Sequence, residues 1–386
     1  MSKRITSQNT KLYAKEEKKM IVMNLELDNF FAFKNFQMNM SYPKKIVNSY
    51  IQGEFLKERT NFRYKKVNVI MGANATGKTT IGRMLMSIFN FIDKKESFHI
   101  VNKIEDNNET ATFSIDFVTN KYILYRIDVK VLPEDEENRV VLVSVRNVDI
   151  NKNDNYETCI ERLLHAPLNY KENYVDELAK IEKLGWMFTY PEDSSNGKVK
   201  CSDKVDYPMI LNCTLKALDP AIKEVEKINE VENSYVIRME KRDLIIQDGE
   251  VIKNNVLSSG TKAGIDIARL ISAIRCGEYG FFYCDEKFSY VHSDVEKAFL
   301  GLMINSLRDN DQFFFTTHNT DILDMPLPKH TYTILRKDPH NIEKPIDCVE
   351  PAKYLKRNTD SLRNAVENDL FSSAPDLENI FEIENI

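Results

Sequence analysis

A glycine-rich segment that runs into lysine and threonine is the part of the sequence with the most specific chemistry. Gly72, Gly77, Lys78 and Thr79 fit the pattern Gly-x4-Gly-Lys-Thr. An apolar run precedes the pattern and apolar residues at helical spacing follow it over 81–92, which predicts a strand, a turn and a helix. In such a turn, backbone N–H groups meet phosphate oxygens, the lysine neutralises the β- and γ-phosphates, and the threonine hydroxyl binds Mg²⁺. The sequence therefore predicts a nucleotide-binding site made of Gly72, Asn74, Ala75, Thr76, Gly77, Lys78, Thr79 and Thr80.

Two later apolar runs end in polar side chains. Residues 280–284 lead to Asp285 and Glu286, and residues 313–316 lead toward His318. The carboxyl ends of parallel strands are where α/β sheets place groups that contact ligands. We expect Asp285 to hold Mg²⁺ with the threonine of the glycine-rich turn, Glu286 to act as general base toward water, and His318 to sense the γ-phosphate. Taken alone, each segment is also compatible with an ordinary strand end. The predicted catalytic residues are Lys78, Glu286 and His318.

A turn of small residues, Leu257-Ser-Ser-Gly-Thr261, precedes another predicted helix. We call it the signature turn. Such a turn at a helix N-terminus is a second anion site. Because one glycine-rich turn already surrounds the phosphates of its own nucleotide, a second set of donors makes sense if it closes on the nucleotide of another subunit. We therefore expect Ser258, Ser259 and Gly260 to act in trans; a serine-rich helix cap is the alternative.

The rest of the sequence predicts alternating strand and helix segments. Strands are expected over 21–27, 30–36, 67–71, 111–118, 122–132, 139–148, 235–239, 244–247, 251–252, 280–284 and 313–316. Residues 156–232 repeat apolar positions every three or four residues, and Asp219-Pro220 is typical of a helix start. The predicted organisation is a basic N-terminal arm (1–20), a first lobe (21–150), a helical insert (151–234), a second part of the core (235–350) and a helical C-terminal tail (351–386).

Composition excludes several classes of protein. The chain has 386 residues with 42% hydrophobic positions, enough for one large core or two modest ones. We expect neither a membrane span nor a secretory signal, because no apolar stretch approaches the required length of about 18 residues. The six cysteines contain no Cys-x-x-Cys pair, which favours a reduced, cytoplasmic protein. Residues 1–66 hold 14 basic against 6 acidic residues, although the whole chain has a net charge of −6.

The order of the four motifs resembles that of the ATP-binding-cassette (ABC) ATPases. Asn74 gives the glycine-rich turn the form found in the SMC, RecF and OLD branch, and residues 285–292 are similar to that branch's D-loop. Residues 361–375 resemble the end of compact AAA15-type ATPases from anti-phage defence systems of the PARIS and AbiL kind. The resemblance implies an α/β ABC-ATPase (P-loop NTPase) core with a mixed sheet, an N-terminal antiparallel β subdomain and a helical insert before the signature turn. It also implies Mg²⁺-dependent ATP hydrolysis in a homodimer or larger homo-oligomer.

Two positions differ from the pattern of these ATPases, and the lengths of two segments exclude some of their functions. No glutamine lies between Gln52 and Gln247, so the usual Q-loop glutamine is missing, and Ser259 stands where SMC proteins favour glycine. The segment between Thr80 and Leu257 is too short for an SMC-type coiled coil, and the part after His318 is too short for a Toprim nuclease domain.

The leading hypothesis is therefore an ATPase that acts as sensor and regulator in anti-phage (abortive infection) defence and controls a separate effector, such as a Toprim-type nuclease. The alternative is a RecF- or SMC-like ATPase that binds nucleic acid during DNA repair, and a third hypothesis is an ATP-gated dimer with negligible turnover. The basic residues that would bind DNA in the alternative are Lys44, Lys45, Lys57, Arg59, Arg63, Lys65 and Lys66.

Overall fold

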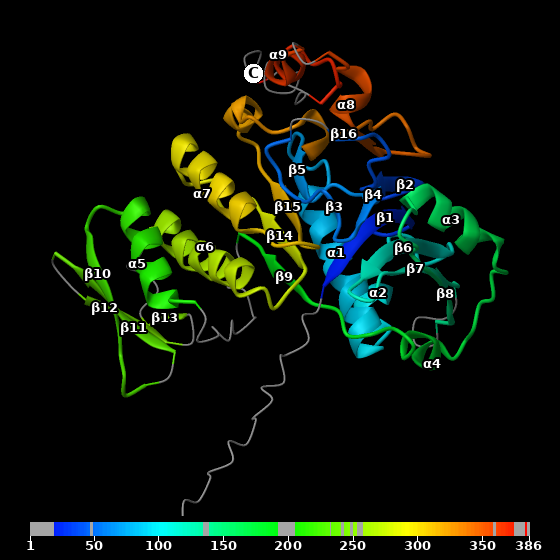
Figure 1. Ribbon diagram of the computed structural model, residues 1–386, viewed down its shortest axis with the longest axis horizontal. Helices are drawn as coiled ribbons and strands as arrows, with labels where there is room; N and C mark the ends of the chain where they lie inside the picture. The colour runs from blue at the N-terminus through cyan, green and yellow to red at the C-terminus, as the bar shows by residue number, and fades with distance from the viewer. Residues whose placement is uncertain are drawn as a thin grey trace, which may run out of the picture.

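The computed structural model describes residues 19–46, 49–133, 139–191, 205–231, 233–240, 243–247, 250–252, 258–357, 360–373 and 383. Three larger sheets and a two-stranded hairpin occur in these residues, with helices between and around the sheets (Figure 1). The predicted basic arm lies almost entirely outside the described residues, and Leu257 of the signature turn also lies outside them. The division of the chain at residues 20, 150, 234 and 350 stays a prediction.

A six-stranded mixed sheet forms the centre, with the strand order β17-β16-β5-β15-β14-β9. All neighbouring pairs are parallel except β16 and β17. Because β5, β14 and β15 are parallel neighbours or next neighbours, their carboxyl ends meet at one edge, where the chain continues into the three predicted nucleotide motifs. The strands are β5 (Val67–Met71), β9 (Trp186–Thr189), β14 (Phe281–Asp285), β15 (Gln312–Thr316), β16 (Tyr332–Lys337) and β17 (Ile346–Val349).

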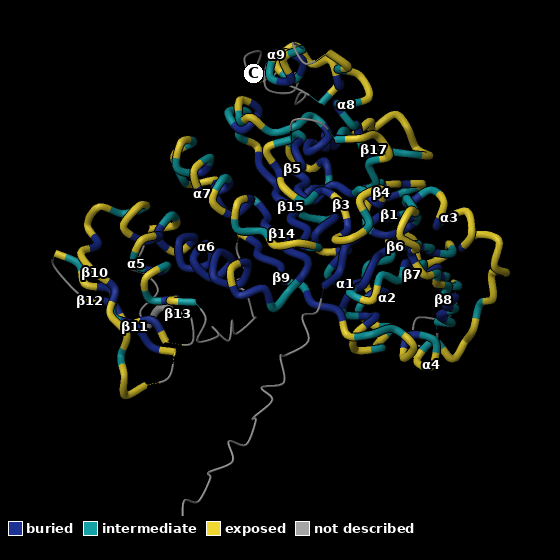
Figure 2. The backbone as a smooth tube through the Cα atoms, in the orientation of Figure 1, coloured by how far each residue is buried: buried dark blue, intermediate teal, exposed yellow. Residues whose placement is uncertain are grey.

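The central sheet is buried on both faces, which is why its strands are continuous apolar runs (Figure 2). Tyr283 and Phe314 belong to the core cluster that contains helix α1. Their neighbours Phe282 and Phe315 belong to the cluster that contains helices α6 and α7. Helix α1 therefore covers one face of the sheet, and α6 and α7 cover the other (Figure 1). These helices are α1 (Lys78–Lys94), α6 (Ser259–Cys276) and α7 (Ser293–Ser306).

The contact between α1 and the sheet depends on a glycine. A Cβ on Gly82 would lie 2.5 Å from Cε1 of the Tyr283 ring, which packs against the helix. We expect Gly82→Ala to lower the free energy of unfolding by about 1–3 kcal/mol, because the buried ring has little room to move. Gly301 in α7 is the matched control: nothing lies within 4 Å of its added Cβ, so Gly301→Ala should stabilise the protein by about 0.5–1 kcal/mol. Urea denaturation of both variants measures the difference, and equal effects would contradict this packing.

A five-stranded antiparallel sheet lies beside the central sheet, with the order β2-β1-β6-β7-β8. Four of its strands confirm the predictions over 21–27, 111–118, 122–132 and 139–148, but the strand expected over 30–36 is wrong, because the chain turns there and β2 begins only at Phe36. A short hairpin of β3 (Phe55–Leu56) and β4 (Arg59–Arg63), which the sequence did not predict, precedes the central strand β5. The sheet comprises β1 (Met20–Asp28), β2 (Phe36–Asn39), β6 (Ala111–Thr119), β7 (Ile123–Val131) and β8 (Val141–Asp149), and the short helix α2 (Phe98–Val101) follows α1.

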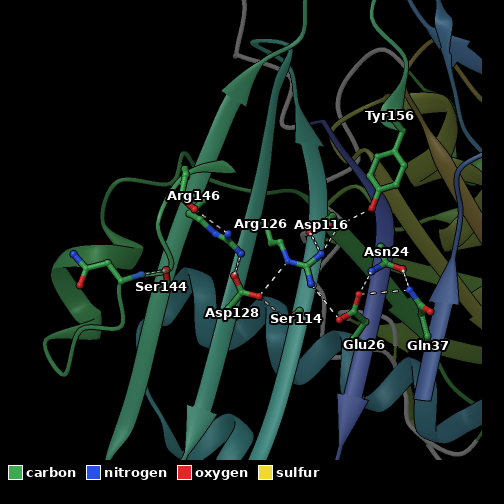
Figure 3. A network of polar contacts seen from close by, with 12 residues as sticks. Asn24, Glu26, Gln37, Ser114, Asp116, Arg126, Asp128, Ser144, Arg146 and Tyr156 are labelled. Atoms are coloured by element: carbon green, nitrogen blue, oxygen red, sulfur yellow. Dashed lines mark hydrogen bonds and ion pairs between the residues drawn. The ribbon is translucent and has the colours of Figure 1, made fainter. Parts of the chain in front are cut away.

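A network of charged side chains crosses this antiparallel sheet (Figure 3). The guanidinium of Arg126 lies 3.1 Å from carboxylate oxygens of Glu26, Asp116 and Asp128. Tyr156, the first residue of helix α3 (Tyr156–His165), donates its hydroxyl to Asp116 Oδ2 at 2.6 Å. The network therefore ties α3 to three strands of the sheet.

Asp116 should make the stability of the protein depend on pH. Burial raises the pKa of Asp116 from its ordinary value of 3.8 to about 7, although Arg126 opposes this shift. The folded chain then holds the proton more tightly than the unfolded chain, so this carboxyl makes folding less favourable as pH rises from 3.8 to about 7. We expect the free energy of unfolding of the wild type to fall across this range relative to Asp116→Asn. Urea denaturation at several pH values tests this, and parallel profiles would contradict it.

The segment predicted as a helical insert is only partly helical. It contains α3, α4 (Tyr174–Leu178) and α5 (Tyr207–Leu218), but also β9, an edge strand of the central sheet, and β10 (Ile222–Lys227). The prediction that a helix starts at Asp219-Pro220 is wrong. Asp219 ends α5, and the chain then forms β10, which pairs with β11. The same Asp and Pro chemistry acts thirteen residues earlier, where Asp206 caps α5 and Pro208 lies in its first turn.

A small four-stranded antiparallel sheet follows, with the order β10-β11-β12-β13. Its inner face packs against α5 and the first half of α6. Two short helices, α8 (Pro351–Tyr354) and α9 (Leu362–Glu367), occupy the described part of the predicted C-terminal tail. Within the described ranges, no helix is both long and apolar enough to cross a membrane. The remaining strands are β11 (Ser234–Met239), β12 (Asp243–Gln247) and β13 (Glu250–Ile252), and the 3-10 turns are η2 (Thr320–Asp324) and η3 (Lys329–Thr331).

Candidate nucleotide-binding site

The glycine-rich turn connects β5 to α1 and needs glycine at two positions. A Cβ on Gly72 would lie 2.4 Å from the carbonyl oxygen of Leu335 in the neighbouring strand. Gly77 caps α1 in the left-handed conformation, with φ at 101°. Thr76 closes the turn by donating its hydroxyl to the carbonyl of Ala73 at 2.9 Å. The turn thus delivers the N-terminus of a 17-residue helix, whose unpaired N–H groups favour an anion, to the sheet edge.

Lys78 lies at the centre of the site. Its Nζ donates to the carbonyls of Gly72 and Ala73 at 2.9 and 3.0 Å. The same nitrogen lies 3.5 Å from Glu286 Oε1 and 3.4 Å from His318 Nδ1. Burial lowers the pKa of Lys78, while the charge of Glu286 works in the opposite direction. The ammonium group is therefore held over the turn, where phosphate oxygens would replace the carbonyls as its partners.

Thr79 and Asp285 form a pair of oxygen donors suited to Mg²⁺. Thr79 Oγ1 donates to Asp285 Oδ2 at 2.7 Å, and Thr316 Oγ1 donates to Asp285 Oδ1 at 2.7 Å. Asp285 is completely buried, and this burial raises its pKa, while the two threonine hydroxyls lower it. One carboxylate and one hydroxyl fit Mg²⁺, which keeps several waters and takes further oxygens from substrate phosphates. No group of three or more His, Cys, Asp or Glu residues elsewhere in the described parts could hold a metal ion.

Glu286 and His318 lie in direct contact. His318 Nε2 is 2.8 Å from Glu286 Oε1. The hydrogen bond from His318 and the charges of His318 and Lys78 lower the pKa of Glu286, so the carboxylate is ionised at neutral pH. The backbone of Glu286 is left-handed, with φ at 42°, and its N–H donates to Thr316 Oγ1 at 3.0 Å. A non-glycine residue in this conformation is strained, and such strain is common at functional sites.

The predicted catalytic residues therefore converge. Lys78, Glu286 and His318 form one cluster at the ends of β5, β14 and β15, next to Thr79 and Asp285. The other predicted nucleotide-binding residues lie in the turn or at the start of α1: Asn74 and Ala75 are exposed, Thr76 is buried and Thr80 is half-buried. Their roles toward ATP stay predictions.

Sequence reasoning missed Thr316 as a functional residue. Its hydroxyl and carbonyl are hydrogen-bonded to the Asp285 side chain and the Glu286 backbone N–H. It was predicted only as the last residue of an apolar strand. The signal was a threonine ending a strand that is otherwise phenylalanine, directly before polar residues.

The signature turn is not brought together with the glycine-rich turn of the same chain. Ser258 caps α6, because its side-chain oxygen accepts a hydrogen bond from the N–H of Thr261 at 3.1 Å. The turn is therefore a helix cap, and its role in trans stays a prediction. Helix α6 lies on the opposite face of the central sheet from α1. A Cβ on Gly260 would lie 3.5 Å from the nearest atom, the carbonyl oxygen of Tyr290. The described part of the signature turn thus begins a helix that lies on the other face of the central sheet from α1.

The basic residues named for DNA binding do not form one exposed set. Lys65 and Lys66 are buried, with exposed fractions of 1% and 3%. Lys65 pairs with Glu350, and Lys66 donates to the carbonyl of Gln52. The remaining five are exposed or half-buried: Lys44, Lys45, Lys57, Arg59 and Arg63.

Comparison with known proteins agrees with this geometry at the level of the fold. No protein-family model matches the sequence, and no curated protein matches it. The Smc head domain with an extended coiled coil, bound to the C-terminal domain of ScpA and derived from Pyrococcus furiosus, is similar with a TM-score of 0.52 and 12% identity, over 87% of this chain and 98% of that chain. An SmcHead bound to the C-winged helix domain of ScpA gives a TM-score of 0.49 at 14% identity, over 86% and 99% of the two chains. RecF gives 0.41 at 13% identity, over 86% and 99%.

The fold is similar to that of an Smc head domain. This confirms the predicted α/β fold with a mixed central sheet. The prediction of a helical insert over 151–234 is only partly correct, because this segment also contains the strands β9 and β10.

Proposed function

We propose that this protein binds ATP with Mg²⁺ and hydrolyses it. The observation that carries the proposal is the convergence of Lys78, Glu286 and His318 beside the Thr79–Asp285 pair, at one end of the central sheet. These groups come from three strands that are far apart in the sequence, and a chance glycine turn would not bring them together.

Each group has a role in hydrolysis that follows from its position. The N-terminus of α1 and Lys78 bind the β- and γ-phosphates, and Thr79 and Asp285 hold Mg²⁺, which neutralises the charge of these phosphates. Glu286 accepts a proton from the water that attacks the γ-phosphate in line. His318, 2.8 Å from Glu286, orients this carboxylate and reaches toward the γ-phosphate. Most of the catalysis then comes from positioning and charge.

The active form in this proposal is a homodimer with two ATP molecules between the subunits. Helices α1 and α6 lie on opposite faces of the sheet, so Ser258, Ser259 and Gly260 cannot complete the site of their own chain. A second copy, placed head to tail, would bring its signature turn to the γ-phosphate. Each composite site then takes its P-loop and catalytic residues from one chain and its signature turn from the other.

In the cell, we propose that ATP-driven dimer closure controls a separate effector protein, in bacterial anti-phage defence. This step rests on two features of the sequence. Residues 361–375 resemble the end of compact defence ATPases, and the segment between Thr80 and Leu257 is too short for an SMC-type coiled coil. The similar Smc head domain also holds a separate polypeptide, ScpA. A RecF-like role in DNA repair is weakened by the burial of Lys65 and Lys66.

Purification of Glu286→Gln from its host with Mg²⁺-ATP tests the cellular role. This variant should trap the ATP-closed dimer, so a partner that depends on that state should remain bound. We expect a co-purifying protein that is absent when Lys78→Met is purified in the same way. Bound DNA that is released at raised salt, without a protein partner, would contradict the effector role and favour DNA repair.

A further inference from the structure

Lys287, the residue directly after Glu286, is buried and tied to helix α6. Its Nζ lies 2.6 Å from Asp266 Oδ2, and it also donates to the carbonyl of Pro191 at 3.3 Å. The side chains of Lys287 and Asp266 are 4% and 10% exposed. A buried lysine of this kind is held in place, because leaving it without its anion would cost several kcal/mol.

Asp266 connects this lysine to the helix that begins with the signature turn. It lies two turns after Ser258 in α6 and also pairs with Arg269 Nη1 at 3.2 Å. Almost every residue of α6 from Thr261 to Cys276 is buried, so packing holds the helix along its length. A displacement of the signature turn therefore reaches Asp266, and through it Lys287.

The backbone between Asp285 and Lys287 has little freedom. Glu286 has a left-handed φ of 42°, its N–H is bonded to Thr316, and its carbonyl accepts the Ser289 hydroxyl at 2.8 Å. Thr316 fixes the side of Glu286 that faces the sheet, and Lys287 fixes the side that faces α6. A strained conformation persists only where its surroundings hold it.

We propose that Lys287 is a positioning residue for ATP hydrolysis: its ion pair with Asp266 ties the backbone of Glu286 to the signature helix. The inference rests on the proposed function, since it assigns Lys287 to the same site. In the dimer, Glu286 serves the nucleotide of its own chain, and the signature turn serves that of the partner. The ion pair thus joins the two composite sites within one chain, in a protein that lacks a glutamine between Gln52 and Gln247.

Three variants separate positioning from stability. Lys287→Met removes the charge and leaves Asp266 paired with Arg269. Lys65→Met is the matched control, because Lys65 is equally buried and its partner Glu350 keeps Lys353 at 2.9 Å. Lys287→Arg retains the charge and should retain activity.

We expect Lys287→Met to lower kcat for ATP hydrolysis by about 10- to 100-fold while KM changes by less than about two-fold, because a small displacement of the base slows chemistry without weakening ATP binding. Lys287→Arg should recover most of kcat. Lys65→Met should change the thermal midpoint by as much as Lys287→Met but leave kcat near the wild-type value. Equal losses of kcat in Lys287→Met and Lys65→Met would overturn the proposal.

Hydrogen exchange provides a readout that needs no hydrolysis. In the nucleotide-free protein, Lys287→Met should speed amide exchange in residues 286–291 and leave α1 unchanged, whereas Lys65→Met should leave the exchange of both segments unchanged. Unchanged exchange in 286–291 would overturn the proposal. If the wild type does not hydrolyse ATP, the proposed function fails, and this exchange comparison still decides whether Lys287 holds the Glu286 backbone.

Discussion

Lys78→Met should abolish ATP hydrolysis, with kcat/KM falling by about 10³-fold or more, and should weaken ATP binding. The ammonium group of Lys78 lies between the glycine-rich turn and Glu286, where the negative charge of the γ-phosphate develops in the transition state. Loss of one preorganised donor at such a point typically costs about 10²–10³-fold, and loss of a full charge costs more. Steady-state kinetics and binding of a fluorescent ATP analogue measure the two effects.

Lys94→Met is the matched control for Lys78→Met. It makes the same chemical change on the same helix, but Lys94 is exposed in the last turn of α1, far from the sheet edge. Its activity should equal that of the wild type. Retention of ATP binding and hydrolysis by Lys78→Met would contradict the assignment of the phosphate site.

Glu286→Gln should lower kcat by about 10²- to 10⁴-fold while ATP binding is kept or strengthened, because the amide cannot accept a proton from water. The amide has nearly the shape of the carboxylate and still accepts the hydrogen bond from His318. Single-turnover kinetics with Mg²⁺-ATP, together with light scattering of the ATP-bound protein, should show a stable dimer that does not hydrolyse its nucleotide.

Glu58→Gln is the control for Glu286→Gln. Glu58 also has a left-handed backbone, with φ at 64°, but it lies exposed in the turn between β3 and β4. A reduction in rate for Glu58→Gln comparable with that for Glu286→Gln would show that the effect is on folding rather than on the base. An unchanged rate in Glu286→Gln would favour the third hypothesis, an ATP-gated dimer with negligible turnover.

The convergence of the candidate site residues could be predicted because each motif is local. The pattern from Gly72 to Thr79 carries its own strand, turn and helix signals, and Asp285 and His318 follow apolar runs that only a buried parallel strand explains. The strand patterns likewise predicted β1, β6, β7 and β8 of the antiparallel sheet, since one face of that sheet is covered and the other carries polar side chains. They placed β2 too early, over 30–36.

Features that depend on distant partners could not be predicted. Strand β9 has only four residues, and its partner β14 lies more than ninety positions later. The helical spacing of apolar residues around β9 therefore led to the prediction of a helical insert. Lys65 was assigned to a basic surface because nothing near it in sequence reveals its contact with Glu350. The ion pair between Lys287 and Asp266 was missed for the same reason: charge alone does not show whether a lysine is buried.

Mixing two inactive variants tests directly whether each nucleotide site is shared between two chains. Lys78→Met destroys the P-loop of a chain but keeps its signature turn. Gly260→Asp places a negative charge in the signature turn but keeps the P-loop. An added Cβ on Gly260 would make an ordinary van der Waals contact, 3.5 Å from the carbonyl oxygen of Tyr290, and an acidic residue is favourable in the first turn of a helix, so the variant should fold. Each variant alone should be inactive.

Random pairing of equal amounts makes half of the dimers mixed, and each mixed dimer has one intact composite site of two. We therefore expect the mixture to recover about a quarter of the wild-type ATPase activity. A mixture no more active than the two variants alone, or full activity of Gly260→Asp by itself, would contradict the shared site.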